Sequence, residues 1–201
     1  MAKASWVKVS PSQGSGNATV NVSSTAVHTG RVARTSILTW KAANVDDVQR
    51  TVNQAGKPEY VDIADAASAD QGGKVVTISG VSNSKKLTFS LGTGDLTNIT
   101  LPGTYIANSL TTSNGAAISG DPGATAEYNF SITITVPANT ETSAKTRQII
   151  VEDEGGHRDV CLLTSAAGDA YITIAEGEIK LDYQGTPVAV AVKSNTTWTV
   201  E

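Results

Sequence analysis

The sequence has little of what disulfide crosslinking or membrane insertion requires. Among its 201 residues there are one cysteine, one methionine and two histidines. The single Cys161 excludes a disulfide within the chain and is compatible with a reducing compartment. The longest apolar stretch, residues 187–192, is far shorter than the roughly 20 residues of a transmembrane helix. The residues after Met1 turn polar at once, so we expect no signal peptide and no membrane partner.

The sequence also lacks the pattern of a catalytic, cofactor or metal site. Cys161 lies in an apolar run without a nearby base, and His28 lies in a polar loop, where we expect a surface position. The densest polar cluster, residues 152–159, carries carboxylates and His157, which in principle could bind a divalent metal. Its central Gly155-Gly156 pair instead favours a solvated β-turn. We therefore predict a protein that is not an enzyme, with no catalytic, cofactor-binding or metal-binding residues.

The residues that are abundant favour β-structure. Thr, Val, Ile, Ser and Gly dominate, while the helix formers Leu and Met are scarce. Apolar and polar residues alternate in short runs that are separated by turn signals such as Gly72-Gly73 and Asn114-Gly115. The sequence therefore predicts an all-β fold of antiparallel sandwiches. The expected strands cover residues 18–23, 74–80, 87–91, 128–136, 147–152, 160–164, 171–174, 188–192 and 197–200.

An internal repeat sets the expected domain organisation. Residues 54–63 are echoed by residues 166–174, and their tyrosines, Tyr60 and Tyr171, are 111 residues apart, about one immunoglobulin-like domain. The phase of the repeat makes residues 59–169 one whole unit. Residues 1–58 then correspond to the back half of a unit, and residues 170–201 to the front half. We predict two immunoglobulin-like β-sandwich equivalents, one whole and one split between the chain ends.

The split unit can close in two ways. The two ends of one chain can meet, or the end of one copy can complete the beginning of the next by strand exchange. A seven-stranded sandwich has its chain ends at opposite poles, which favours closure between copies. The predicted interface then contains Trp6, Val7 and Val9 of one copy and Trp198 and Val200 of its neighbour.

Charge is distributed unevenly along the chain. Residues 1–58 carry seven Lys/Arg against two Asp/Glu, residues 59–169 carry six against thirteen, and residues 170–201 carry two against four. This contrast favours head-to-tail contact between copies, although two unrelated solvated surfaces would produce it equally. The basic charges are few and dispersed along strands, so we expect no nucleic-acid partner.

The two chain ends together resemble a known domain family. When residues 194–200 are followed by residues 5–16, the joined text resembles the BACON family, immunoglobulin-like β-sandwiches that are common in Bacteroidetes proteins. The family's closing element corresponds to Gln54-Ala55-Gly56 and, in the second unit, to residues 165–168. The central unit departs from the pattern, because residues 86–89 lack the tryptophan and residues 101–121 form a longer insertion.

Residues 1–24 also resemble small virion proteins of crAss-like bacteriophages, which infect gut Bacteroides. The resemblance implies an auxiliary, or decoration, capsid protein that is made in the host cytoplasm and resides in the virion. The implied partners are the major capsid protein, other virion proteins and further copies of the chain. A head-fibre or tail component is the alternative within the same class.

A third function from a different class is a carbohydrate-binding adhesion module. Exposed aromatic rings could stack on the sugars of mucin-type glycans, and the tryptophans Trp6, Trp40 and Trp198 are the candidates. Trp6 and Trp198 alternate with apolar neighbours, which favours packing in a core or junction. Trp40 is therefore the predicted glycan contact.

Overall fold

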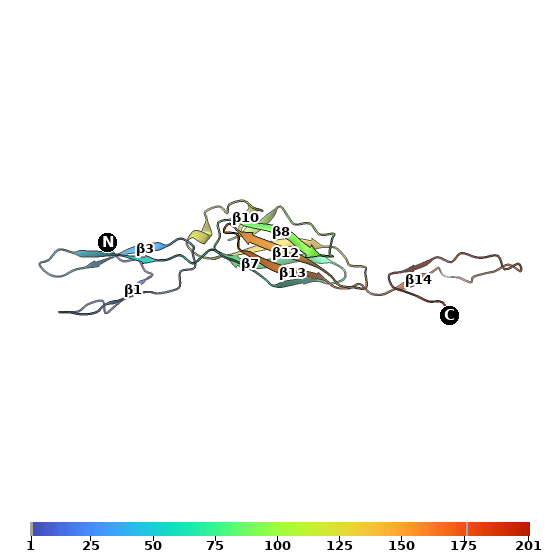
Figure 1. Ribbon diagram of the computed structural model, residues 1–201, viewed down its shortest axis with the longest axis horizontal. Helices are drawn as coiled ribbons and strands as arrows, with labels where there is room; N and C mark the ends of the chain where they lie inside the picture. Colours follow the sequence, from blue (N-terminus) through green and yellow to red (C-terminus); the bar gives the residue numbers. More distant parts are fainter. Residues whose placement is uncertain (1, 176) are drawn as a thin grey trace.

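The chain consists of a central β-sandwich between two extended arms (Figure 1). The computed structural model describes residues 2–175 and 177–201. We call residues 2–58 the N-terminal arm and the described residues from 170 onward the C-terminal arm. The two arms leave the sandwich at opposite ends (Figure 1). The predicted all-β class is confirmed, because the only helical element in the described part of the chain is a single 3-10 turn, η1 (Pro122–Ala124).

Two sheets form the central sandwich. The first contains five strands in the order β10-β9-β11-β7-β5 and the second four strands in the order β6-β13-β12-β8. Every neighbouring pair is antiparallel except β13 and β6, which are parallel. The strands are β5 (Val61–Ile63), β6 (Ala66–Ala69), β7 (Lys74–Ser82), β8 (Leu87–Gly94), β9 (Thr104–Ala107), β10 (Leu110–Ser113), β11 (Tyr128–Val136), β12 (Lys145–Asp153) and β13 (Arg158–Ser165).

The core lies between the two sheets, as the alternation in the sequence predicts. Strand β11 buries every second residue and exposes or half-exposes the ones between. Its buried face meets apolar side chains from the second sheet, and the rings of Phe89 and Phe130 approach to 5.8 Å between centroids. The largest fully buried apolar side chains include Phe130, Ile63, Ile78, Leu87, Ile132, Ile134, Ile149 and Leu163.

Each arm contains only short two-stranded antiparallel sheets. In the N-terminal arm, β1 (Val7–Ser10) pairs with β2 (Asn21–Ser24), and β3 (Arg34–Trp40) pairs with β4 (Val48–Gln54). Val7 and Leu38 are its only buried apolar side chains among residues 2–58. In the C-terminal arm, β14 (Ile172–Ile174) pairs with β15 (Val192–Ser194). No described residue of this arm is buried.

The expected strands of the central sandwich are as long as predicted or longer, whereas those of the arms are shorter, displaced or absent. Seven observed strands were not expected: β1, β3, β4, β5, β6, β9 and β10. Residues 188–191 and 197–200 are not strands and have no strand pairing in the described part of the chain. The expected strand over 18–23 is reduced to β2. The insertion over 101–121 contains the hairpin β9–β10, which the sequence did not indicate. Its turn places Asn108 and Ser109 at positive φ without the glycine that usually marks such turns.

Replacing Phe130 tests the account of the core. Phe130 is 2% exposed and lies against Phe89, so Phe130→Ala leaves a cavity between the sheets. We expect it to lower the free energy of unfolding by about 3–5 kcal/mol, measured by urea denaturation. Val75→Ala, on the neighbouring strand and 61% exposed, is the control and changes that free energy by no more than about 0.5 kcal/mol. Equal effects of the two substitutions would contradict this description of the core.

Candidate functional site

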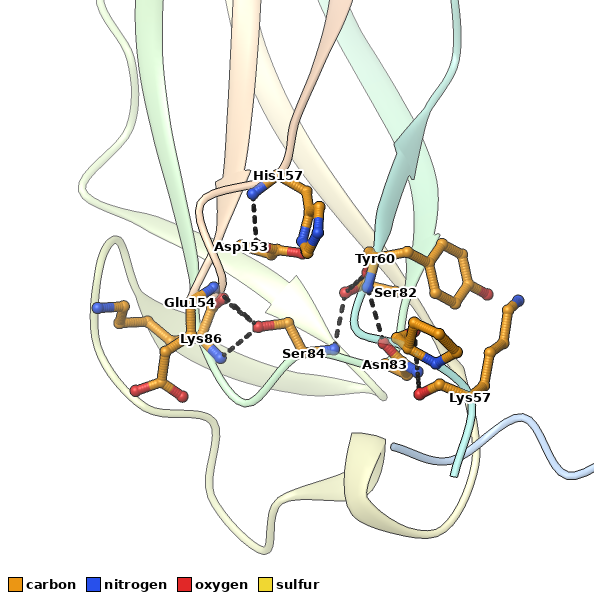
Figure 2. Close-up of polar contacts among 10 residues, drawn as sticks. Lys57, Tyr60, Ser82, Asn83, Ser84, Lys86, Asp153, Glu154 and His157 are labelled. Carbon is orange, nitrogen blue, oxygen red and sulfur yellow. Dashed lines mark hydrogen bonds and ion pairs between the residues drawn. The ribbon is translucent and has the colours of Figure 1, made fainter. Parts of the chain in front are cut away.

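The buried side chain of Asn83 holds the N-terminal arm to the central sandwich (Figure 2). Its Nδ2 amide lies 3.2, 3.3 and 3.2 Å from the backbone carbonyl oxygens of Thr29, Lys57 and Pro58, to which it donates. Its Oδ1 accepts a hydrogen bond from the backbone N–H of Tyr60 at 3.0 Å. One amide side chain therefore joins a loop of the arm, the chain that leaves the arm and the beginning of the sandwich.

The serines on either side of Asn83 extend this contact. The Ser82 hydroxyl donates to the Tyr60 carbonyl at 2.7 Å and accepts the Ser84 backbone N–H at 2.9 Å (Figure 2). The Ser84 hydroxyl donates to the Lys86 carbonyl at 2.8 Å and accepts the Glu154 backbone N–H at 3.1 Å. These bonds satisfy the hydroxyl groups of two buried serines, as burial of polar groups requires.

The end of the insertion closes the same junction from the other side. The Arg31 guanidinium donates to both carboxylate oxygens of Asp121, with 2.6 Å from Nη1 to Oδ1, and its Nη1 also donates to the Asn83 carbonyl at 3.1 Å. The hydrogen bonds from Arg31 hold the pKa of the Asp121 carboxyl below its usual range. A Cβ on Gly123 would lie 2.0 Å from the Asn83 carbonyl oxygen, so this close packing requires glycine.

The same side-chain contacts recur where the sandwich meets the C-terminal arm. The Asn195 Nδ2 donates to the carbonyls of Thr140 and Asp169 at 2.8 and 2.9 Å, and its Oδ1 accepts the Tyr171 backbone N–H at 2.9 Å. The Ser194 hydroxyl donates to the Tyr171 carbonyl at 2.9 Å. Each of these residues lies 111 or 112 positions after its counterpart at the first junction.

Backbone contacts follow the same repeat. The Lys57 N–H donates to the Gly30 carbonyl at 2.9 Å, and the Gly168 N–H donates to the Glu141 carbonyl at 2.7 Å, again 111 residues later. The N-terminal arm is therefore joined to the sandwich in the same way as the sandwich is joined to the C-terminal arm. The repeat of this junction is visible in the sequence, because Ser82-Asn83-Ser84 and Ser194-Asn195-Thr196 occupy equivalent places. Neither asparagine was among the predicted site residues.

His28 belongs to this junction rather than to the exposed surface. The prediction of a surface position was wrong, because the side chain is buried and its Nε2 lies 2.7 Å from the Val32 carbonyl. Asn139 takes the equivalent place at the second junction and donates from Nδ2 to the Ser143 carbonyl at 2.8 Å. Each of these side chains closes a tight loop that contacts the next unit. The polar sequence around His28 did not indicate that its side chain would be buried.

The predicted interface residues lie in the two arms. Val7 is fully buried within its own arm, Val9 is half-buried, and Trp6 is half-buried with the Arg34 guanidinium 4.6 Å from its ring centroid. Trp198 and Val200, in the other arm, are 48% and 82% exposed. The structure thus separates the two groups by the whole central sandwich and does not bring them together within one chain (Figure 1).

A groove of about 580 Å³ opens in the N-terminal arm between the β1 and β3 segments. Val9, Leu38 and Trp40 provide its apolar lining. Lys3 and Lys41 also line it, and Lys41 forms an ion pair with Asp47 at 2.8 Å. Trp40, the predicted glycan contact, is 40% exposed at this groove. The groove therefore offers both an apolar surface and basic side chains to an occupant.

The polar cluster over residues 152–159 forms a hairpin turn. The Asp153 carboxylate is buried and accepts hydrogen bonds from the His157 backbone N–H at 2.8 Å and from its Nδ1 at 2.9 Å (Figure 2). Gly156 has a φ of 86°, which suits the turn. Within residues 2–175 and 177–201, no group of three or more His, Cys, Asp or Glu residues is arranged to hold a metal ion.

Burial raises the pKa of the Cys161 thiol to about 11.

Comparisons with known proteins give structural likenesses at low sequence identity. No family model matches it, and no curated protein matches it. One similar solved structure is an NMR structure of a protein from Bacteroides thetaiotaomicron, 11% identical, covering 56% of this chain and 89% of that chain with a TM-score of 0.28. Another is the collagen binding domain of Erysipelothrix rhusiopathiae surface protein RspB, also 11% identical, covering 75% of this chain and 63% of that chain with a TM-score of 0.21. In the described residues, no helix has the length and apolar character to cross a membrane.

The ion pair at the first junction predicts a pH-dependent stability. Because the pKa of Asp121 is lowered on folding, its ionised form stabilises the fold at all pH values above its unfolded pKa of about 3.9. This contribution is lost as the pH falls through the lower, folded pKa. Asp121→Asn should therefore lower the free energy of unfolding by about 1 kcal/mol at pH 7, and the difference should shrink below about pH 4.

Urea denaturation measures the free energy of unfolding of this variant, and two features separate the effect of the charge from other effects. Asparagine tolerates the left-handed φ of 43° at this position, so the backbone is not strained. Asp46→Asn, in the exposed loop between β3 and β4, is the matched control and should have no effect at either pH. A loss of stability for Asp121→Asn that is the same at pH 3 and pH 7 would show that the charge is not responsible.

Proposed function

We propose that this chain is a structural protein of a virion, an auxiliary protein that decorates a bacteriophage capsid and joins further copies of itself through its arms. The observation that carries the proposal is the pair of incomplete arms at opposite ends of one complete sandwich (Figure 1). A two-stranded sheet is marginally stable in water without a covering layer. The arms therefore need a partner. Because they lie at opposite ends of the sandwich, each arm would contact a different neighbouring molecule.

The C-terminal arm has the apolar surface that a partner would cover. None of its described residues is buried, although it is rich in large apolar side chains. A soluble monomer rarely leaves so much apolar surface together in one segment. The exposed large side chains are Tyr171, Ile172, Ile174, Ile179, Leu181, Tyr183, Val188, Val190, Trp198 and Val200.

Charge supports contact between opposite ends of two copies. Residues 1–58 carry an excess of positive charge and residues 170–201 an excess of negative charge. Opposite charges attract unlike ends, and like charges repel identical ends, so head-to-tail association is favoured over symmetric pairing. The basic groove in the N-terminal arm, with Lys3 and Lys41 at its edge, is the surface that meets the acidic arm.

The proposal that assembly takes place on a capsid rests on the sequence resemblance of residues 1–24 to small virion proteins. The elongated chain suits this role, because its ends reach neighbours that a compact protein of the same length would not (Figure 1). Contacts between copies would add buried area across the junctions of the capsid subunits and so resist their separation. The major capsid protein and other virion proteins are the further proposed partners.

Removing the last six residues tests the proposal. The truncation after Asn195 keeps the second junction and deletes the apolar Trp198 and Val200. We expect the full-length protein to form concentration-dependent oligomers in light scattering and to co-sediment with capsids that lack it. The truncated protein should stay monomeric and bind capsids at least about tenfold more weakly, because the covered apolar surface is lost.

The control is the thermal unfolding of the central sandwich, which should be the same in both proteins. A truncated protein that assembles and binds as well as the full-length protein would contradict the role of the arms. A full-length protein that stays monomeric and fails to bind capsids would overturn the proposal itself.

Trp40 supports a second candidate, the carbohydrate-binding module. Its ring is partly exposed at the open groove, where a sugar ring could stack on it. A glycan array with the full-length protein separates the two functions. Binding that is lost in Trp40→Ala but kept in Trp198→Ala would favour adhesion, whereas the capsid proposal predicts no glycan binding by any of the three proteins.

A further inference from the structure

The hairpin β3–β4 of the N-terminal arm repeats the inner strand pair β12–β13 of the sandwich. Arg34 lies opposite Gln54, and the residues 111 positions later, Lys145 and Ser165, also lie opposite each other. All other pairs of the two hairpins keep the same spacing. The half-buried residues of β4 are the counterparts of buried residues of β13. Strand β4 is therefore equivalent to β13, residue by residue.

The outer edge of β4 lacks the neighbour that β13 has. Strand β6 lies parallel to β13, with Ala69 opposite Ser165, and the Ala166 N–H donates to the Ala69 carbonyl at 2.9 Å. Among the described residues, β3 is the only strand beside β4. The Ala55 N–H, the equivalent of the Ala166 N–H, has no backbone partner in that part of the chain. The edge of β4 is thus open to a strand that takes the place of β6.

The C-terminal arm repeats the turn that follows β6. The Gly73 N–H donates to the Asp70 carbonyl at 3.0 Å, and the Gly185 N–H donates to the Asp182 carbonyl at 3.1 Å. Both glycines have left-handed backbones, with φ of 73° and 72°. Strand β6 ends directly before the first turn. By the same count, residues 178–181, directly before the second turn, are the equivalent of β6.

The alternation of side chains supports this count over the one that starts from β14. Strand β6 turns its second and fourth residues toward the core. Counted from the turn, Ile179 and Leu181 take these two places. Counted from β14, the alignment moves by one residue, and Glu178 and Lys180 would face the core. A shift by one residue exchanges the two faces of a strand, so only the count from the turn buries apolar side chains.

Residues 178–181 already carry two kinds of surface in the single chain. Ile179 and Leu181 are 59% and 63% exposed. Glu178 and Lys180, which alternate with them, form an exposed ion pair at 3.5 Å and so lie on the same side. Alternation of this kind is typical of a strand with one buried and one solvated face. The segment therefore has the pattern of an edge strand whose sheet is missing.

A second contact of the sandwich leads to the same arrangement. The Asn139 N–H donates to the Gln71 carbonyl at 2.9 Å, so the loop after β11 holds the turn after β6. In the repeat, His28 takes the place of Asn139, and Tyr183 takes the place of Gln71 within the second turn. Tyr183 is 96% exposed. If residues 178–181 lie along β4, the Tyr183 carbonyl comes to the loop of His28, as the Gln71 carbonyl comes to the loop of Asn139.

We propose that residues 178–181 of one copy add to the outer edge of β4 of a second copy as a parallel strand, with Ile179 opposite Val52 and Leu181 opposite Gln54. The occupant comes from a second copy, because the two arms of one chain leave the sandwich at opposite ends (Figure 1). The inference rests on the proposed self-association. Since each copy has one such edge and one such segment, the contact repeats in one direction from copy to copy.

The remaining strands of the arms fit the same composite domain. Strands β14 and β15 take the places of β5 and β7, whose pairing they repeat. Strand β2 takes the place of β11, because residues 16–22 match residues 123–129, which lead into β11. Strands β15 and β2 would then lie side by side, as β7 and β11 do.

Cysteine pairs on separate chains, placed on the outward face, test the register along β4. Four single variants, Thr51→Cys, Asn53→Cys, Glu178→Cys and Lys180→Cys, are mixed in pairs and oxidised gently. Opposite residues of neighbouring strands lie about 4.7–4.9 Å apart, within the reach of a disulfide. Residues displaced by two positions are about 8 Å apart and outside that reach. The unmodified chain, whose Cys161 is buried, is the background control.

The expected result is a disulfide-linked dimer in the mixtures of Thr51→Cys with Glu178→Cys and of Asn53→Cys with Lys180→Cys. The two crossed mixtures should give at least about tenfold less dimer. A mixture of Asn53→Cys with Ile179→Cys tests the alignment counted from β14, and it should also give at least about tenfold less, because the two side chains point to opposite faces.

All five substituted side chains are exposed in the single chain, so folding is not at risk, and light scattering checks that each variant assembles. Assembly with dimers mainly in the crossed mixtures, mainly in the mixture with Ile179→Cys, or in none would overturn the register and leave the proposed function standing. Absence of assembly in the unmodified chain would overturn both.

Discussion

A strand that lacks a neighbour leaves backbone N–H and C=O groups without partners, and this constraint governs the whole molecule. The central sandwich satisfies it internally, since its inner strands have a neighbour on both edges and its core is shared by two sheets. The arms do not satisfy it. Their short sheets leave free edges and exposed apolar side chains, which the proposed assembly would cover.

The two junctions explain why the arms are held in place although they are incomplete. Asn83 and Asn195 make the same contacts 112 residues apart, and each joins a finished strand to the unit before it. Because Asn83 is buried within the chain and Asn195 is not, the second junction has only part of the surroundings of the first. A neighbouring copy would complete those surroundings, which links the junction geometry to the proposed assembly.

The sequence predicted the parts of the fold that depend on the chain's own core. The alternation over residues 128–136 gave the bounds and the buried face of β11, and the apolar run around Cys161 gave a buried strand. It did not predict the β9–β10 hairpin, whose turn uses Asn108 and Ser109, or the burial of His28. The hairpin depends on the pairing of β9 with the distant strand β11, and His28 is held by the Val32 carbonyl within its own loop. Residues 188–191 and 197–200 have strand-like sequences and form no strand in this chain, and the proposed neighbouring copy is what would order them.

Backbone hydrogen exchange at two concentrations tests the central claim that one copy completes another. In dilute solution, the amides of residues 18–24 and 188–194 should exchange fast, while those of β11 and β12 are protected. At high concentration, both arm segments should become protected together, since each strand supplies the other's missing partner. Protection that stays the same at every dilution, or that develops in one arm without the other, would contradict the account.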